Sequence, residues 1–172
     1  SVSGNYSKRM PVTETLVRAT DFAEQTLALD PSSADADAAL GEVAGVEYRR
    51  HTAASLLTRA IALRPSFATA YQWRGNQLMG NGDLVGGLAE LEHASALDPR
   101  SWVVAETRAF LLQTLGRYAD SKAACQRTLE VAPTYVACLE IVAMTDLQLG
   151  EGDDARSMFA RLAAARNPSA GA

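Results

Sequence analysis

The sequence predicts an all-α fold built from repeated pairs of antiparallel helices. A proline recurs at a constant interval, each time after a similar apolar segment, at Pro31, Pro65, Pro99 and Pro133. A glycine recurs with the same period, at Gly82, Gly116 and Gly150. A fixed period of roughly 20–50 residues is typical of a repeat array, in which each repeat is one small group of packed elements.

The first predicted helix covers residues 12–29. Pro11 stands where proline suits a helix start, and Pro31 cannot continue the helical hydrogen-bond ladder. Apolar residues between them fall at helical spacing, at Leu16, Ala19, Ala23 and Leu27. No stretch of the chain alternates apolar and polar residues as a strand would, and the bias towards alanine and leucine also favours helices.

Four units of two helices each follow, over residues 34–65, 68–99, 102–133 and 136–168, which brings the total to about nine helices. The recurring glycine closes the first helix of a unit because it accepts a positive φ. Tyr48 stands where unit one would have this glycine, so we expect that turn to be looser or differently shaped. Gly86 and Gly87 lie inside the second helix of unit two, which should be the softest part of the array, since each glycine costs about 0.5–1 kcal/mol relative to alanine.

These boundaries predict the domain organisation. Residues 1–11 form a flexible N-terminal segment, residues 12–168 form a single domain that opens with the half-repeat 12–31, and residues 169–172 form a tail. The last unit ends one residue late, at Pro168, and no capping helix follows it. The outer face of its second helix should therefore carry exposed alanine and leucine.

The register resembles that of the tetratricopeptide repeat (TPR) family, whose pattern is W-x2-L-G-x2-Y, then A-x3-F, then alanine and proline. The match in the second unit consists of Tyr71, Gly75, Leu78, Gly82, Asp83, Leu91, Ala94 and Pro99. The resemblance implies a right-handed superhelical α-solenoid whose concave groove is lined by the first helix of each unit. It also implies a non-catalytic module that binds a peptide or a partner domain in this groove.

A second resemblance concerns the TPR tracts of bacterial signalling proteins, which include transcriptional regulators and adenylyl cyclases. It rests on Trp73-Arg74-Gly75-Asn76, on the segment 97–101 and on Gly116-Arg117-Tyr118. The alternative function is therefore a regulatory, sensory or dimerisation domain of a larger signalling protein. The cytoplasm is the favoured compartment, and the periplasm is the alternative for a membrane-anchored parent.

The sequence contains no residues in an arrangement typical of a catalytic site. His51 and His93 are distant in the sequence and fall on second helices of different units. No catalytic triad, nucleophile elbow or zinc-protease motif occurs, and we expect no enzyme activity, cofactor or metal site. Cys125 and Cys138 flank the turn at Pro133, where they could form a disulfide. The favoured interpretation is that both are unbonded and serve as small buried apolar residues.

The resemblance to the TPR family implies that particular positions of each first helix line the groove. The predicted partner-binding residues are Gln72, Trp73, Asn76, Met79, Glu106, Phe110, Gln113, Glu140 and Met144. Trp73 and Phe110 could instead pack inside the core. None of the predicted groove residues is basic, whereas the chaperone-binding TPRs hold a carboxylate with lysines. Glu42 and Glu106 would repel that carboxylate, so we expect no binding of acidic chaperone tails.

The charge pattern narrows the class of partner. The net charge is −4 and the charged residues are scattered, which argues against direct binding of nucleic acid. No apolar run is long enough to span a membrane. The expected partner is therefore a protein or peptide, with self-association through the terminal helices as a further expectation.

Overall fold

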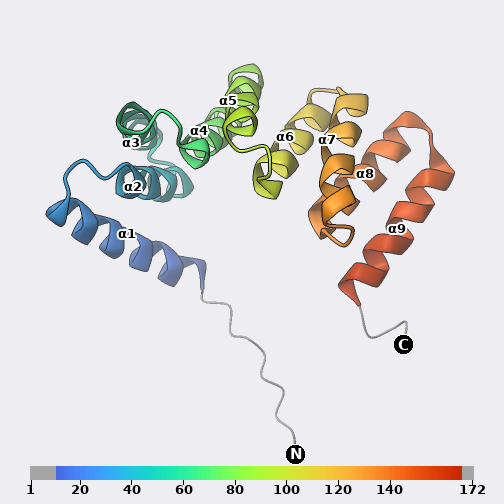
Figure 1. Ribbon diagram of the computed structural model, residues 1–172, viewed down its shortest axis with the longest axis horizontal. Coiled ribbons are helices and arrows are strands. Elements are labelled where there is room, and N and C mark those ends of the chain that lie inside the picture. Colours follow the sequence, from blue (N-terminus) through green and yellow to red (C-terminus); the bar gives the residue numbers. More distant parts are fainter. Residues whose placement is uncertain (1–10, 168–172) are drawn as a thin grey trace, which may run out of the picture. The chain divides into compact units, whose positions relative to one another are not determined.

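The computed structural model describes residues 11–167, and this part of the chain consists of helices joined by short turns (Figure 1). The nine helices in it are α1 (Val12–Leu29), α2 (Ala34–Val46), α3 (Arg50–Leu63), α4 (Ala68–Gly80), α5 (Leu84–Leu97), α6 (Trp102–Thr114), α7 (Tyr118–Val131), α8 (Val136–Leu149) and α9 (Gly152–Arg166). Each helix lies within one of the ranges predicted from the repeat. The predicted flexible segment, apart from Pro11, and the tail with Pro168 lie outside the described residues.

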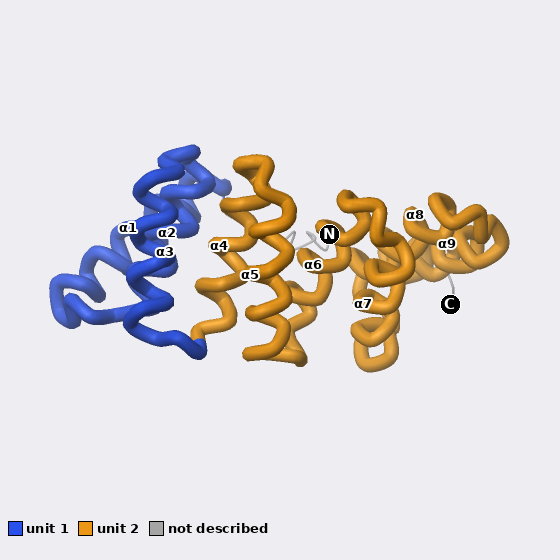
Figure 2. The backbone as a smooth tube through the Cα atoms, turned by 90° about the horizontal axis from the view of Figure 1, so that it is seen from above, with its two compact units in different colours: residues 1–66 blue, residues 67–172 orange. Residues whose placement is uncertain are grey.

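The chain divides into two compact units (Figure 2). The first contains α1, α2 and α3, and the second contains α4 to α9. Within the first unit, α2 packs against both α1 and α3. Within the second, successive helices pack as the pairs α4–α5, α6–α7 and α8–α9, and α6 also contacts α8. No helix in the described part of the chain is both long and apolar enough to cross a membrane.

The turn inside each repeat has a left-handed residue. Gly82, Gly116 and Gly150 have φ values of 89°, 74° and 78°, as the glycine period predicted. Tyr48 has φ 59° and joins α2 to α3 with the same backbone pattern: its own N–H donates to Gly45 O and the next N–H donates to Ala44 O. The prediction of a looser turn is therefore wrong, because the helix pair imposes the same turn even where a side chain resists it.

Small residues allow the paired helices to approach closely. A Cβ atom added to Gly87 in α5 would lie 3.0 Å from the carbonyl oxygen of Gly75 in α4. One added to Gly86 would lie 2.3 Å from the carboxylate of Asp83, which caps α5 by accepting the Gly86 N–H at 2.8 Å. The two glycines predicted to soften α5 thus also provide its close contact with α4 and its N-terminal cap.

Two clusters of buried apolar residues lie in the described part of the second unit. One lies between α5 and α6 and consists of Leu88, Leu91, Leu111 and Leu112. The larger one joins α6, α7, α8 and α9 and includes Leu139, Val142 and Leu162. Cys125 and Cys138 lie at its centre, fully buried and joined by a disulfide with a Cα–Cα distance of 5.1 Å. The favoured interpretation of two unbonded cysteines is wrong about the bond and correct about the burial.

Two carboxylates are buried with cationic partners that the sequence pattern did not reveal. Asp146 in α8 has no exposed surface, and its Oδ1 lies 2.7 Å from the Nζ of Lys122 in α7. The same ammonium contacts Glu151 at the turn into α9. In the first unit, the buried Asp37 lies 3.2 Å from the Nε of Arg59.

Candidate functional site

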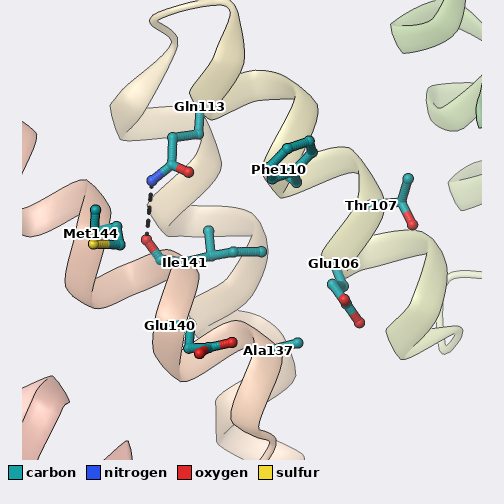
Figure 3. Close-up of a pocket in the computed structure, with 8 residues that line it drawn as sticks. All are labelled: Glu106, Thr107, Phe110, Gln113, Ala137, Glu140, Ile141 and Met144. Carbon is teal, nitrogen blue, oxygen red and sulfur yellow. Dashed lines mark hydrogen bonds between the residues drawn. The ribbon is translucent and has the colours of Figure 1, made fainter. Parts of the chain in front are cut away.

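A cavity of about 360 Å³ lies between α6 and α8 in the second unit (Figure 3). Residues spaced three or four apart share a helix face, so α6 presents one row of side chains to the cavity and α8 presents another. The lining residues are Glu106, Thr107, Phe110, Gln113, Ala137, Glu140, Ile141 and Met144. Five of the nine predicted partner-binding residues therefore meet around one hollow: Glu106, Phe110, Gln113, Glu140 and Met144.

The apolar side chains of this cavity are in part open to solvent. Phe110 is 50% exposed and Met144 is 46% exposed, whereas Ile141 is buried. If a partner covers them, each large apolar side chain of this kind contributes roughly 1.5–3 kcal/mol to the binding free energy. The predicted alternative for Phe110, a place inside the core, does not apply to a ring with this exposure.

Gln113 connects the two walls. Its Nε2 donates to the Thr145 hydroxyl oxygen at 2.9 Å and to the Ile141 carbonyl oxygen at 3.4 Å. Figure 3 shows the second of these bonds. Since α6 and α8 belong to successive repeats, this side chain fixes one relative to the other. A neighbouring cavity of about 210 Å³ also has Gln113 and Met144 in its lining, so the hollow surface continues past them.

One end of the cavity is acidic. The hydroxyl of Tyr135 donates to Glu106 Oε2 at 2.5 Å, and its ring lies 5.7 Å from that of Trp102. Burial and the adjacent Glu106 carboxylate raise the pKa of Tyr135 to about 12, so this donor stays neutral at physiological pH. Glu140 accepts a hydrogen bond from Arg166 of α9. The eight lining residues include two carboxylates and no lysine or arginine.

The four predicted residues on α4 lie outside this cavity. Gln72 is buried, with 7% of its surface exposed. Met79 packs against the leucine cluster between α5 and α6. Trp73 and Asn76 are half-buried. On α4, Trp73 and Met79 are thus less exposed than Phe110 and Met144, and their role in partner binding stays a prediction.

Sequence reasoning missed Ala137, Tyr135 and Thr145. Ala137 stands one repeat length after Val103, so its repeat position was the signal that could have placed it in the cavity. Tyr135 and Thr145 act through Glu106 and Gln113, and such contacts depend on the packing of two repeats. Among the described residues, no group of histidine, cysteine or acidic side chains is arranged to hold a metal ion.

Among the comparisons with known proteins, the solved structures indicate the fold. No family model matches the chain, and no curated protein matches it. Among solved structures, it is similar to MamA with a TM-score of 0.77, at 16% identity over 95% of this chain and 99% of that one. It is similar to PilF of Pseudomonas aeruginosa with a TM-score of 0.79, at 22% identity over 89% and 70% of the two chains.

A third similar structure is YrrB, described as a TPR protein with an unusual peptide-binding site, with a TM-score of 0.69. It is 18% identical over 91% of this chain and 80% of that one. The constant repeat period, the left-handed turn inside each repeat and these structural likenesses together identify the chain as a protein with the tetratricopeptide-repeat fold.

Proposed function

We propose that the chain is a non-catalytic protein-interaction module that binds a peptide segment in the cavity between α6 and α8. The observation that carries this proposal is the convergence there of Phe110 and Met144, both about half exposed, on a hollow of about 360 Å³. Exposed aromatic and methionine side chains around a pocket are typical anchors of protein interfaces. The similarity to YrrB, whose description names a peptide-binding site, supports the same class of ligand.

The acidic end defines the chemistry of the peptide. Glu106 is bonded to a neutral hydroxyl, so its negative charge has no cationic partner in that contact. Glu140 already faces Arg166. A peptide that places an apolar side chain between Phe110 and Met144 and a lysine or arginine near Glu106 matches both features. A peptide ending in acidic residues does not, because a carboxylate would meet Glu106 in a partly dehydrated site.

Selection from a phage-displayed random peptide library tests this function without a known partner. We expect the selected peptides to share an apolar residue with a basic residue close to it, and to bind in fluorescence polarisation. Replacing Phe110 or Met144 by alanine should weaken that binding about tenfold or more, as for residues at the centre of an interface.

A matched control is Val85→Ala on α5, since Val85 is 75% exposed and lies outside the cavity lining. Glu106→Gln should reduce the preference for the basic residue while keeping the apolar one. If selected peptides bind the Phe110→Ala/Met144→Ala double variant as tightly as the original chain, peptide binding at this cavity is refuted.

A further inference from the structure

A second cavity, of about 200 Å³, lies on another face of α6. It is lined by the last turns of α5 and α7, the turn between α5 and α6, and the first two turns of α6. Its lining includes Arg100, Arg108 and Arg127 beside Trp102 and Ser101, and contains no carboxylate. At about 100° per residue along α6, Ala105 and Arg108 point well away from Glu106 and Phe110, so this cavity is separate from the proposed peptide site.

Arg108 lacks the carboxylate partner that the equivalent arginine of the preceding repeat has. That counterpart, Arg74, donates to both carboxylate oxygens of Glu90 at 2.9 and 2.8 Å. The residue one repeat length after Glu90 is Ala124, which lines the cavity. The Nε atoms of both Arg74 and Arg108 are buried and have no hydrogen-bond partner. The difference between the two arginines lies in the rest of the guanidinium group: Arg74 donates from Nη2 to Glu90, whereas no carboxylate of the described residues pairs with Arg108. The charge of Arg108 is therefore available to an anionic ligand.

Arg127 likewise lacks the hydrogen-bond acceptor that the equivalent arginines of other repeats have. Arg59, two repeats earlier, donates to the Pro31 carbonyl oxygen at 2.5 Å, and Arg161, one repeat later, donates to that of Pro133 at 3.1 Å. Within the described part of the chain, Arg127 makes no such bond to Pro99, although both residues line the cavity. Its guanidinium group is thus available to a ligand where its counterparts are engaged within the fold.

The electrostatic environment of these arginines is that of a site for an anion. Burial and the positive charge of Arg127 lower the pKa of Arg108, and Arg117 acts in the same direction; Glu92 and Asp120 oppose them. None of Arg100, Arg108 and Arg127 forms an ion pair with a carboxylate of the described residues. The nearby Asp98 carboxylate accepts the backbone N–H of Arg100 instead.

The α6 N-terminus adds to this positive field. Ser101 caps the helix by accepting the Val104 N–H at 3.3 Å, and Ser101 and Trp102 both line the cavity. The amino end of a helix favours an anion. The C-terminal turns of α5 and α7 act in the opposite sense, and arginines near such helix ends also stabilise them. Titration with phosphate separates the two roles.

We propose that this cavity binds a phosphoryl group. Its volume is below the roughly 300–1,000 Å³ of pockets for drug-sized ligands, so it suits a single small anionic group. Arginine is the side chain best matched to phosphate, because its planar fork donates two parallel hydrogen bonds. The exposed ring of Trp102 at the edge of the cavity could stack on a base if the phosphoryl group belongs to a nucleotide.

Isothermal titration calorimetry with inorganic phosphate tests the proposal, using sodium chloride at matched ionic strength as the reference salt. We expect saturable binding at one site, weakened about tenfold by Arg127→Gln, since a charge-assisted hydrogen bond is lost. The matched control is Arg156→Gln, which makes the same charge change on the exposed surface of α9. It should leave phosphate binding unchanged.

A second variant tests the loss of the Arg108 partner directly. Ala124→Glu restores the carboxylate that the preceding repeat has at Glu90, and we expect it to pair with Arg108 and abolish phosphate binding without loss of helicity. If Ala124→Glu fails to fold, Arg108→Lys, which keeps the charge but not the fork, should still weaken binding. Phosphate that binds no better than chloride, or that binds Arg127→Gln as it binds the original chain, overturns the proposal.

The source of the phosphoryl group follows from a parallel titration with ADP. Tighter binding of ADP than of phosphate, with the difference lost in Trp102→Leu, indicates a nucleotide. Equal binding of the two indicates free phosphate, and either result supports the site. Binding of an aspartate-rich peptide through Arg127, with no binding of phosphate, would refute the phosphoryl assignment.

Discussion

Replacing Tyr48 by glycine should stabilise the first unit. Tyr48 has φ 59° in the turn between α2 and α3, where three other repeats have glycine. The left-handed conformation costs an ordinary residue roughly 1–2 kcal/mol. Glycine avoids this cost but loses about 0.4–1 kcal/mol through the greater freedom of its unfolded chain. The ring is 82% exposed, so little burial is lost. At the midpoints of these two ranges the net gain is about 0.8 kcal/mol.

Thermal and urea unfolding, followed by circular dichroism, measure this gain. For a chain of this size, we expect the Tm to rise by about 1–4 °C. Tyr48→Ala is the first control: it removes the ring but keeps the Cβ atom, so it should give no comparable gain. Gly116→Ala is the reverse control, because a Cβ atom there meets nothing within 4 Å and any loss of stability must come from the backbone.

The reasoning is refuted if Tyr48→Gly is no more stable than Tyr48→Ala. It is also refuted if Gly116→Ala unfolds at the same temperature as the original chain, because the left-handed backbone would then carry no measurable cost.

Three further predictions concern buried groups. Lys122→Met should lower the free energy of unfolding by about 3 kcal/mol because it leaves the buried Asp146 without its cation, and adding Asp146→Leu should recover most of this loss in urea unfolding. Reducing the disulfide between Cys125 and Cys138 should lower the free energy of unfolding by up to about 3 kcal/mol, measured as a fall in Tm. The Cys125→Ala/Cys138→Ala variant should show the same fall in Tm, and adding reductant to that variant should not lower its Tm further. Burial raises the pKa of Asp37, and its cationic partner opposes the rise only in part, so ionisation of this carboxyl destabilises the folded state. Its contribution becomes unfavourable as the pH rises through the raised folded pKa. Asp37→Asn should therefore increase the free energy of unfolding near neutral pH by on the order of 1 kcal/mol, seen as a higher Tm, and should lose this advantage at about pH 4 or below.

The repeat register was predictable because it depends on local backbone chemistry. Proline ends a helix whatever surrounds it, and glycine at a helix end accepts a positive φ. The turn at Tyr48 shows where this reasoning fails. The two flanking helices need the left-handed residue to pack as a pair, and the packing outweighs the preference of a tyrosine side chain.

The site was predictable only in part. Family positions brought Phe110 and Met144 to one cavity, but they gave Gln72 the same status although its side chain is buried. Whether a groove position is open depends on the size of the side chains around it, which a position number does not encode. The pairing of Lys122 with Asp146 was likewise hidden, because it joins residues that become neighbours only when two repeats stack.

The disulfide between α7 and α8 changes how the array can open. In a linear array, stability is set by each repeat and its contacts with neighbours, so terminal repeats can detach one at a time. A covalent bond between repeats three and four merges them into a single cooperative segment. Hydrogen exchange should then find similar protection in α7 and α8. Since α6 pairs with α7, the same bond ties together the two helices, α6 and α8, that line the cavity of the proposed peptide site.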